Sequence, residues 1–525
     1  MARRDRKAVR IDGPAGRPSF TGSPPVVVVV GGGIAGLAAA TSLAERGARV
    51  VLCEREDHLG GRAGGWPTRL ADGSAATMTR GFHAFFRQYY NLRALLRRVD
   101  PHGDALVGLP DYPLWHADGH RDGFAGLPTA VPWNALGFLA RSRTFRWRDL
   151  RDVDARVALP LLDVSVPRTY HELDRLDAAD YLARLRFPEA AQAPAFEVFS
   201  RSFFAHPSRM SAAELVTMFH TYFLGSSEGL LFDVAADPFP HRLWDPLGRR
   251  LTDLGATVRT GVEVTAVSRG GPKRFTVHSA SAAAALGGAT ADGGVIAADA
   301  VVLALDVRGL RRVVESSPEL GDRPWRADVA RLETAPRFLV SRYWLDRPVA
   351  ADRPGFVGTS GYGLLDNVSV LDRYEHEARA WASRTGGAVV ELHGYSLPDE
   401  VDGAAARGLL LEQLHEVYPE TKAARVVDER HELRADCPLF PPGGFPHRPP
   451  VPTPEPFLVP AGDLVRIDLP VALMERAATT GFAAANHLLR RWGVAGTPLW
   501  SVPTAGRVPL LRAIARKWGH NPQPG

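Results

Sequence analysis

Three glycines, Gly31, Gly33 and Gly36, follow five consecutive valines with the spacing Gly-x-Gly-x-x-Gly. The valines predict a buried parallel strand, and residues Leu37 to Arg46 predict a helix that starts at the glycine turn. Unpaired backbone N–H groups and the helix dipole at such an N-terminus favour a pyrophosphate, and glycine lets the backbone approach it closely. This turn is therefore a candidate dinucleotide site.

A carboxylate, Glu54, ends the second strand of the same unit. The strand is predicted at Arg49 to Cys53, and Glu54 lies 18 positions after Gly36. A dinucleotide fold places the acid that accepts a ribose 2′-OH at about this distance. A carboxylate there repels a 2′-phosphate, so the pattern disfavours NADP. Because strand, glycines, helix, strand and acid arrive in order, the unit predicts a bound dinucleotide rather than a glycine-rich loop without a ligand.

The composition is that of a globular protein large enough for more than one core. Of 525 residues, 45% are hydrophobic and 23% are charged, so we expect two domains that share a cleft. The net charge is +5, but the arginines are scattered among acids, which argues against nucleic acid as a partner. Cys53 and Cys437 do not make a disulfide framework and suit a reducing cytosol. No uninterrupted apolar stretch predicts a membrane span.

The order of predicted strands and helices that position these residues indicates an α/β fold (α+β overall). It consists of a Rossmann-like dinucleotide-binding domain, discontinuous in sequence, and a mixed sheet-and-helix substrate domain. The predicted pieces of the first are residues 26–105, 235–310 and 430–490, and those of the second are 106–234 and 311–429. Residues 1–25 predict a disordered leader, and residues 491–525 predict a basic amphipathic tail.

Two further motifs carry a family resemblance. The loop Gly60-Gly61-Arg62 and the late turn Ala461-Gly462-Asp463, together with the glycine turn, resemble the FAD-dependent amine oxidase and carotene desaturase superfamily. The resemblance implies that the Rossmann-like domain binds FAD, that the late turn holds the ribityl and pyrophosphate groups, and that the following helix points at the isoalloxazine ring. It implies no metal. The cofactor-binding residues it implies are Gly31, Gly33, Gly36, Glu54, Gly60, Gly61, Arg62, Val264, Gly462, Asp463 and Met474.

A narrower resemblance concerns the segment "GFHAFFRQYYN", residues 81–91. It is similar to a signature of plant and cyanobacterial type carotene desaturases. The stretches "FEVFSRSFF" and "YFLGSSEGLLFDV" are similar to bacterial carotene desaturase/methyltransferases, which turn the rings of β-carotene into aromatic φ-rings of the isorenieratene type. The resemblance implies an oxidoreductase acting on CH–CH bonds of β-carotene, with a quinone or O2 reoxidising the flavin.

Such a reaction needs an apolar slot, a base and a means of stabilising positive charge. A flavin accepts hydride at N5 from a carbon that the protein aligns away from water. Making a φ-ring removes four ring hydrogens and moves one methyl group, so it needs two flavin turnovers per ring and a proton acceptor. The phenylalanines considered for the slot are Phe82, Phe85, Phe86, Phe196, Phe199, Phe203, Phe204, Phe219 and Phe223. The candidate bases are His83 first, then Glu228, Glu214 and His220.

A carotenoid has no water-soluble form, so we expect contact with a membrane surface. The tail segment "VPLLRAIARKW" places Leu510, Leu511, Ile514 and Trp518 near one helical face, with basic residues beside them. Residues 132–150 are a second candidate. Both segments are equally compatible with helices that pack between domains. The expected location is the cytoplasmic side of the cell membrane, as a peripheral protein.

Other functions share parts of these patterns. An amine oxidase uses the same FAD frame, but the lysine often found near its flavin has no candidate here. Another carotene desaturase, or a flavin-dependent carotenoid isomerase without net oxidation, fits most of the motifs. A non-redox prenyl- or lipid-binding escort protein is the alternative of a different class. Neither the choice between φ-ring and χ-ring products nor the number of ring ends follows from the sequence.

Overall fold

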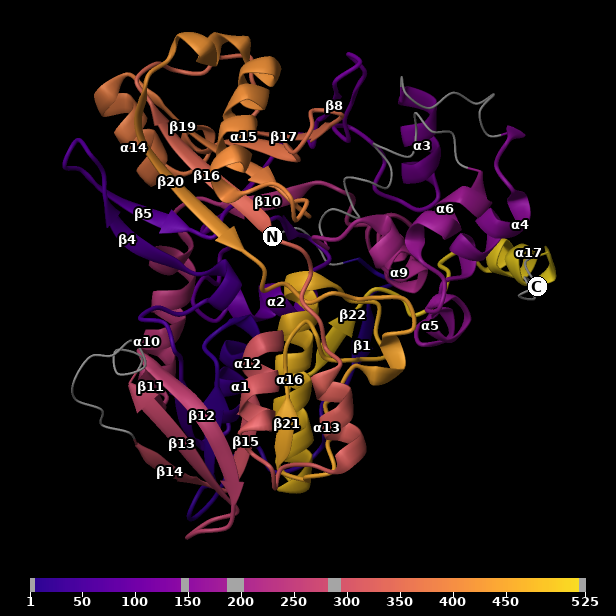
Figure 1. Cartoon of the computed structure of the whole chain (residues 1–525). Coiled ribbons are helices and arrows are strands. Elements are labelled where there is room, and N and C mark those ends of the chain that lie inside the picture. Colours follow the sequence, from indigo (N-terminus) through magenta and orange to yellow (C-terminus); the bar gives the residue numbers. More distant parts are fainter. Residues whose placement is uncertain (1–4, 143–150, 187–202, 282–293, 519–525) are drawn as a thin grey trace.

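The computed structural model describes residues 5–142, 151–186, 203–281 and 294–518. Figure 1 shows two lobes, with α1 (Ile34–Ala44) and α16 (Leu473–Arg491) in the lower lobe and β16 (Phe338–Leu345) and β19 (Ala388–Gly394) in the upper one. Phe196 and Phe199, two of the phenylalanines expected in a substrate slot, lie outside the described residues. Within the parts of the chain that the structure describes, no helix combines the length and apolar character needed to cross a membrane.

A five-stranded parallel sheet forms the centre of the lower lobe. Its strand order is β11-β3-β2-β15-β21, and all neighbouring pairs are parallel. The strands are β2 (Val26–Val30), β3 (Arg49–Cys53), β11 (Thr257–Arg259), β15 (Ala300–Leu303) and β21 (Leu458–Pro460). Val27 to Val30 of β2 are almost fully buried, as expected of a central strand covered on both faces. The predicted strand–turn–helix–strand unit is confirmed, and its helix begins three residues earlier than expected, at Ile34.

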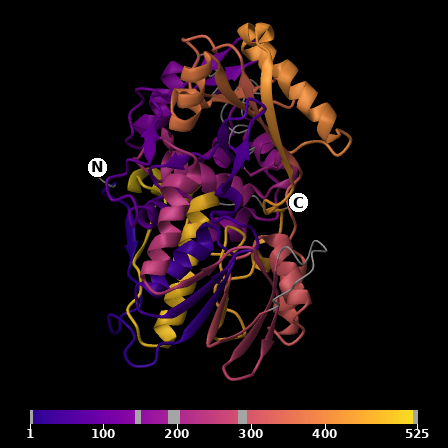
Figure 2. The ribbon, with the colours of Figure 1, turned by 90° about the vertical axis from the view of Figure 1, so that its left-hand side faces the viewer.

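Two helices from distant parts of the chain pack on this sheet, as Figure 2 shows for α16, drawn in yellow. They are α1 (Ile34–Ala44) and α16 (Leu473–Arg491). A Cβ atom on Gly481 of α16 would lie 2.2 Å from the carbonyl oxygen of Ala35, so the two helices meet backbone to backbone. The other elements of this lobe are α2 (Tyr90–Leu96), α10 (Asp245–Asp253), α12 (Val307–Glu315), α13 (Arg323–Ala330), and the antiparallel strands β12 (Val262–Arg269), β13 (Phe275–Ser281) and β14 (Val295–Ala298).

A seven-stranded mixed sheet forms the upper lobe, in the order β20-β16-β19-β18-β17-β8-β9. Its strands are β8 (Leu114–His116), β9 (Arg121–Asp122), β16 (Phe338–Leu345), β17 (Phe356–Ser360), β18 (Asn367–Val370), β19 (Ala388–Gly394) and β20 (Val426–Arg434). All residues of β16 and β19 are buried, and α14 (His376–Thr385) and α15 (Gly403–Val417) accompany the sheet. The predicted boundary at 429/430 falls inside β20, so the strand continues the upper sheet to Arg434.

Short elements join the two lobes. A three-stranded antiparallel sheet has the order β6-β10-β7, and the predicted boundaries at 105 and 234 pass through or beside it. Its strands are β6 (Phe85–Phe86), β7 (Leu106–Gly108) and β10 (Phe232–Ala235). The remaining elements include the β4 (Gly65–Arg69) and β5 (Ala75–Thr79) hairpin, α3 (Trp133–Arg141), α4 (Ala155–Ala158), α5 (Arg168–Leu173), α6 (Ala178–Leu185), α9 (Ala212–Phe219), the π-helical turn η6 (His220–Leu224) and α17 (Pro509–Trp518).

The structure corrects the prediction of a disordered leader for residues 5–25. Strand β1 (Val9–Ile11) pairs antiparallel with β22 (Leu499–Ser501). Asp5 forms an ion pair with Arg507. The leader lacks an apolar run of its own, but it gains backbone hydrogen bonds from a segment near the other end of the chain. Composition alone does not contain that information.

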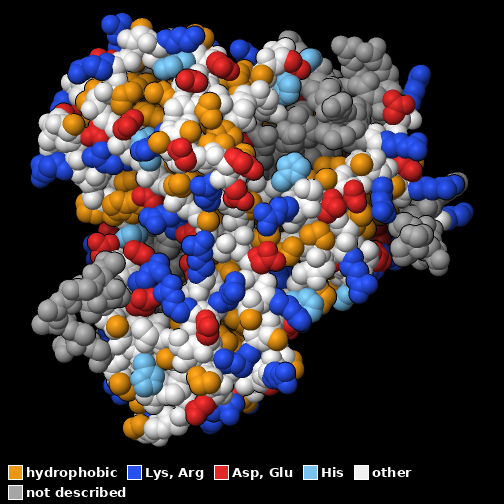
Figure 3. All heavy atoms as spheres, viewed as in Figure 1, with side chains coloured by type: hydrophobic (Ala, Val, Ile, Leu, Met, Phe, Trp, Pro, Cys, Tyr) orange, Lys and Arg blue, Asp and Glu red, His pale blue; other side chains and the backbone are white. Residues whose placement is uncertain are grey.

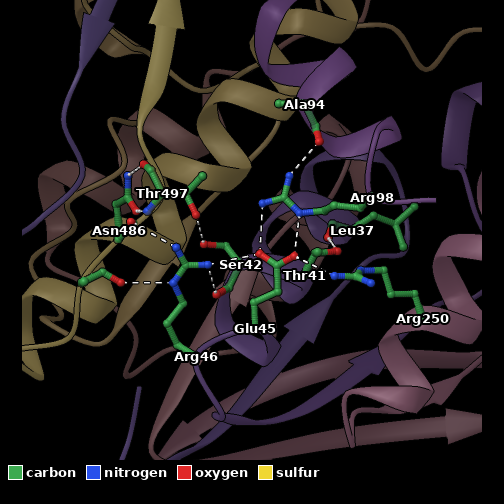
Figure 4. Close-up of polar contacts among 12 residues, drawn as sticks. Leu37, Thr41, Ser42, Glu45, Arg46, Ala94, Arg98, Arg250, Asn486 and Thr497 are labelled. Carbon is green, nitrogen blue, oxygen red and sulfur yellow. Dashed lines mark hydrogen bonds and ion pairs between the residues drawn. The ribbon is translucent and has the colours of Figure 1, made fainter. Parts of the chain in front are cut away.

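A half-buried carboxylate ties the end of α1 to its neighbours (Figure 4). Glu45 accepts hydrogen bonds from Arg98 at 2.8 and 3.0 Å and from Arg46 at 3.1 Å, and Arg250 of α10 lies 3.4 Å away. Arg46 also donates to the backbone oxygens of residues 495 and 496, at 3.1 Å each. Helix α1 is therefore anchored to α10, to Arg98 just after α2 and to the segment after α16, which fixes the glycine turn at its other end.

Candidate flavin and substrate site

The glycine turn is closed on its sheet side and open at the helix N-terminus. Gly31 has φ +104°, and a Cβ atom there would lie 2.2 Å from the oxygen of Ala304. A Cβ atom on Gly36 would lie 1.9 Å from the oxygen of Gly31. Next to Gly33 the nearest heavy atom to such a Cβ is 3.8 Å away, on Gly61. The first contacts explain why the turn must be glycine, and the last leaves room for a phosphate beside the first N–H groups of α1.

Glu54 lies against this turn. Its Oε2 atom accepts a hydrogen bond from Gly32 N at 2.6 Å, and its Oε1 atom accepts one from Glu56 N at 2.8 Å. The side chain is buried, and burial raises the pKa of its carboxyl. The backbone oxygen of Glu54 accepts from Val262 N at 2.8 Å, which brings β12, with the buried Val264, beside the acid. A carboxylate in this position has lone pairs left for a ribose hydroxyl.

The two other predicted cofactor loops meet each other. Arg62 Nη2 donates to Asp463 Oδ1 at 2.5 Å. Burial opposes the charge on Arg62, but Asp463 outweighs it and holds the pKa of the guanidinium above its ordinary value. Gly60 has φ +103° and donates from its N to Gly32 O at 2.9 Å, which joins the Arg62 loop to the glycine turn. A cation and a nest of backbone N–H groups thus lie together, as a diphosphate requires.

The start of α16 completes this set. Gly462 has φ +145° and donates to Thr480 Oγ1 at 2.9 Å, so the late turn is bound to the helix that follows it. Leu473 and Met474, the first two residues of α16, are half-buried. The glycine turn, Glu54, the Arg62 loop and the Gly462–Asp463 turn are therefore linked to one another beside the carboxyl ends of β2, β3 and β21. Their donors and acceptors fit the diphosphate and ribose of FAD. The roles of Val264 and Met474 stay predictions.

A cavity lined by aromatic rings lies at the start of α16. Leu473 forms part of its wall, together with Met218. The aromatic residues of the wall are Phe82, Phe86, Tyr112, Tyr222, Phe232, Phe356 and Tyr395. Phe82 stacks on Phe356 with ring centroids 4.3 Å apart, and Phe86 contacts Tyr222 at 4.5 Å. Such a wall suits an apolar ring that carries positive charge during a reaction.

Of the phenylalanines expected in a substrate slot, Phe82 and Phe86 line this cavity. Phe85 packs on Phe239, Phe203 on Phe440, and Phe219 on Phe223. Phe204 packs on Phe338 and Tyr395. These residues serve packing around the cavity and between elements. The sequence pattern indicated a region rich in aromatic residues. It did not distinguish the residues that line the cavity from those that pack behind them.

His83, the first candidate base, follows the cavity residue Phe82 along the chain. Its Nδ1 atom lies 2.8 Å from Gly81 O, and its ring is edge-on to Phe239 at 5.4 Å. Desolvation lowers the pKa of His83 to about 4, so the imidazole is neutral at pH 7. His83 is not among the described residues that line the cavity. Its role as a base stays a prediction.

The other candidate bases have partners that join distant segments. His220 Nε2 donates to Pro503 O at 2.7 Å, and burial lowers the pKa of His220 to about 4. Glu228 Oε1 accepts from Asp5 N at 2.7 Å and from the Tyr90 hydroxyl at 3.3 Å. Among the described residues of the cavity wall, neither is present. These contacts give both residues a structural role.

Glu214 is also committed to ion pairs. It binds Arg448 at 2.5 Å and Arg476 at 2.8 Å, and all three side chains are almost fully buried. Arg476 Nη1 also donates to the backbone oxygen of Asp463 at 3.3 Å. This carboxylate therefore supports the late turn rather than taking up protons.

The sequence analysis missed a polar chain on the other side of the cavity. Tyr395 and Asn367 line the cavity. The Tyr395 hydroxyl lies 2.8 Å from His393 Nδ1, and His393 Nε2 lies 2.9 Å from Glu391 Oε1. Arg342 binds Glu391 at 2.7 and 2.9 Å. A detectable signal was the alternation of Glu391, His393 and Tyr395 in the otherwise apolar stretch "AVVELHGYS".

Comparisons with known proteins show the family of the chain. The profile described as "Flavin containing amine oxidoreductase" matches residues 34–489. The chain is 60% identical to a carotenoid phi-ring synthase of Streptomyces griseus, over 98% of this chain and 97% of that protein. It is 28% identical to a carotenoid phi-ring synthase of Chlorobaculum tepidum, over 92% and 91% of the two chains.

A solved structure supports the same fold. Putrescine oxidase bound to putrescine matches with a TM-score of 0.63 at 16% identity, over 89% of this chain and 99% of that one. The family profile begins at the first residue of α1 and ends two residues before the end of α16, so it spans the glycine turn's helix, the Arg62 loop, the Gly462–Asp463 turn and the cavity. The chain therefore belongs to the family of flavin-containing amine oxidoreductases.

Proposed function

We propose that this chain converts the β-rings of β-carotene into aromatic φ-rings by desaturation coupled to a 1,2-methyl shift. Membership of its family makes it an FAD-dependent oxidoreductase. The observation that carries the proposal is the aromatic cavity at the start of α16, beside residues that fit FAD. The 60% identity to a protein named carotenoid phi-ring synthase supports the choice of substrate and product.

Several residues would hold the cofactor. The N–H groups at Gly31 to Gly33 and the guanidinium of Arg62 would bind the diphosphate, and Glu54 would accept a ribose hydroxyl. Asp463 keeps Arg62 in place. FAD, when bound, supplies a hydride acceptor for the ring carbons.

The cavity wall serves the carbon skeleton of the substrate. Loss of hydride beside the quaternary ring carbon leaves a secondary cation. Migration of one methyl group moves the charge to a tertiary allylic carbon, and loss of a proton then forms a double bond. The faces of Phe82, Phe356 and Tyr222 stabilise such charge without reacting with it. Most of the wall is apolar, with Asp366, Asn367 and tyrosine hydroxyls as its polar groups, so few groups would hold water that could capture the cation.

A membrane-facing side would supply the substrate. Trp133 and Leu136 of α3 are 62% and 38% exposed, and Leu510 and Ile514 of α17 are 70% and 36% exposed. Figure 1 places both helices on the right-hand side of the molecule, and Lys and Arg side chains project at the same edge in Figure 3. Exposed apolar residues among cations suit the surface of an anionic bilayer, so we propose peripheral binding at the inner face of the cell membrane.

The α17 helix is fixed rather than free. The carboxylate of Asp163, 3% exposed, binds Arg512 at 3.1 Å and Arg516 at 2.8 Å. Ala515 is buried. These contacts hold one side of α17 on the protein and leave Leu510 and Ile514 on the other side. The proposed membrane contact therefore uses a rigid helix face.

Pigment analysis in cells that make β-carotene tests the proposed function. With the chain expressed, chromatography with mass detection should show products four or eight hydrogens lighter than β-carotene with the same carbon count, for one or two aromatic rings. NMR then places the methyl group and separates φ-rings from χ-rings. A product of unchanged mass would indicate an isomerase instead. Unaltered β-carotene, together with a colourless purified protein, would favour a lipid-binding role.

The electron acceptor is decided in a second assay. Purified enzyme reduced by β-carotene in vesicles is mixed with O2 or with a membrane quinone, and reoxidation of the flavin is followed by absorbance. We propose that one of these two acceptors completes the cycle, and the faster one at equal concentration identifies it.

A further inference from the structure

We propose that the Tyr395 hydroxyl accepts the proton that the ring cation loses, and passes its own proton to His393. This inference rests on the proposed function and names the proton acceptor that the function requires. Tyr395 would be the catalytic residue, while His393 and Glu391 act through it.

Tyr395 is the member of the chain that faces the substrate space. It is half-buried and lines the same cavity as Phe82, Phe356 and Leu473. Asn367 Nδ2 donates to its hydroxyl at 3.1 Å, and the hydroxyl lies 2.8 Å from His393 Nδ1. The phenol oxygen therefore accepts one hydrogen bond, from Asn367, and its hydroxyl pairs with His393. Its remaining lone pair is available to the cavity.

The charge behind His393 fixes which of its nitrogens carries the proton. Glu391 is fully buried, and burial opposes its ionisation, but Arg342 and His393 outweigh burial and lower the pKa of its carboxyl to about 2. An ionised carboxylate 2.9 Å from His393 Nε2 requires a proton on that nitrogen. The Phe82 N–H group also points at Nε2, at 3.2 Å, but the ionised carboxylate is the nearer partner and its charge favours the proton on Nε2. Nδ1 is therefore the acceptor, and the Tyr395 hydroxyl donates to it.

The step balances without any further reactant. After the methyl shift, the C–H bond at the carbon that received the methyl group breaks, and its electron pair forms the new ring double bond. The proton binds the Tyr395 oxygen while the former hydroxyl proton moves to His393 Nδ1. The imidazolium that results lies against ionised Glu391, and Arg342 keeps that carboxylate in place. The proton later leaves by the reverse relay when product is exchanged.

A phenol is a sufficient base for this proton. Burial raises the pKa of the Tyr395 hydroxyl, so the residue is neutral at pH 7. A carbocation is a far stronger acid than a neutral C–H group, and the neutral phenol oxygen can take its proton when a second group removes the phenol proton. The Oδ1 atom of Asn367, buried in the same wall, has no hydrogen-bond partner among the described residues. Its partial negative charge favours a cation in the cavity.

The test compares Tyr395→Phe and His393→Asn holoenzymes with the wild type. Both variants should keep a full complement of FAD and a KM for β-carotene within about threefold. For each FAD that is reduced, we expect at least about tenfold fewer aromatic rings. We also expect kcat to fall about a hundredfold, which is in the range of general base catalysis. The missing rings should appear as hydroxylated or incompletely unsaturated products.

A matched control is Tyr343→Phe. Tyr343 is a buried tyrosine of the neighbouring strand β16, and its ring also contacts a histidine, His431, at 5.7 Å, but it does not line the cavity. This variant should form aromatic rings at a rate within about twofold of the wild type. Loss of a buried hydroxyl alone then does not explain the result.

The outcomes separate the two proposals. If wild-type enzyme forms no aromatic ring, the proposed function is wrong, whatever the variants do. If the wild type is active and Tyr395→Phe forms aromatic rings at the same rate and yield, the proton acceptor is another group. If Tyr395→Phe fails to bind FAD, His393→Asn decides, since it keeps the phenol and an amide acceptor beside it but cannot carry the proton onward.

Discussion

Arg62 Nη2 lies 2.5 Å from Asp463 Oδ1, although 401 positions separate the two residues in the chain. Each residue belongs to a loop that the sequence alone assigned to the cofactor. Their contact joins the first and last parts of the nucleotide-binding fold at one point. The affinity for FAD should therefore depend on the pair rather than on either loop alone.

Removing one partner of this ion pair should release the flavin. We expect Arg62→Gln and Asp463→Asn each to weaken FAD binding about tenfold or more, because the other charge is left without its partner. The double variant should lose less than the sum of the two effects. FAD fluorescence titration of the apoproteins measures all three. The control Arg353→Gln breaks a similar pair with Glu420 in the upper lobe and should leave the FAD affinity unchanged.

The Glu45 cluster should make stability depend on acid pH. Burial alone raises the pKa of the Glu45 carboxyl, but Arg98, Arg46 and Arg250 outweigh it and hold this pKa below its ordinary value of 4.5. A carboxyl whose pKa is lower when folded stabilises the protein above its unfolded pKa, and this contribution is lost as pH falls through the folded value. Glu45→Gln should reduce the free energy of unfolding by about 1–3 kcal/mol at pH 7.

Urea unfolding at several pH values checks this expectation. The difference between wild type and Glu45→Gln should shrink steadily below about pH 4.5. Glu319→Gln, at an exposed acid of the same lobe, should change the free energy by less than about 0.5 kcal/mol at every pH. A constant difference down to the lowest pH would show that Glu45 acts through its shape and not through its charge.

The contact between α1 and α16 should not tolerate a methyl group. A Cβ atom on Gly481 would lie 2.2 Å from Ala35 O and 2.9 Å from the Cβ atom of Ala38. Gly481→Ala should therefore lower the free energy of unfolding by about 1–3 kcal/mol. In α15, a Cβ atom on Gly408 would have no heavy atom within 4 Å. Gly408→Ala should therefore raise the free energy of unfolding by about 0.5–1 kcal/mol. Thermal unfolding of the two variants should shift in opposite directions.

The exposed face of α17 should control membrane binding. Leu510→Glu combined with Ile514→Glu should weaken binding to vesicles containing phosphatidylglycerol about tenfold or more, because burial of one such side chain contributes about 1.5–3 kcal/mol. Activity on detergent-solubilised β-carotene should be unaffected. Leu409→Glu, at a leucine of α15 that is 38% exposed, is the matched control. Equal loss of binding in both proteins would show that charge alone, and not this face, decides the interaction.

Local sequence patterns were sufficient to predict the first part of the cofactor-binding domain. Five valines, a glycine turn and an acid at the end of the next strand determine the unit from β2 to Glu54, because all its contacts are near in sequence or between neighbouring parallel strands. The Gly462–Asp463 turn was recognised through the family resemblance of its short motif. Its contact with Arg62 was not, since it depends on the closure of the whole sheet.

The residues around the substrate cavity could not be predicted in the same way. Their positions depend on the register between paired strands, which the sequence does not show. Tyr395 lines the cavity, and His393 and Glu391 stand behind it, because β19 lies between β16 and β18, with Asn367 opposite His393. The contact of Glu228 with Asp5 N joins residues 223 positions apart, and its role as a base stays a prediction. Such long-range contacts decide what each side chain touches, and no single segment encodes them.

The position of β21 in the parallel sheet has a consequence for biosynthesis. This strand, at residues 458–460, pairs with β15, which pairs in turn with β2 near the other end of the chain. A ribosome adds roughly 5–20 residues per second, so β2 leaves the exit tunnel tens of seconds before its sheet can be completed. The nascent protein must wait with exposed valines and an unfinished nucleotide pocket. We therefore expect flavin to bind only after residues 458–463 have left the ribosome, so a shortage of cofactor in the cell should show as aggregation of newly made chains.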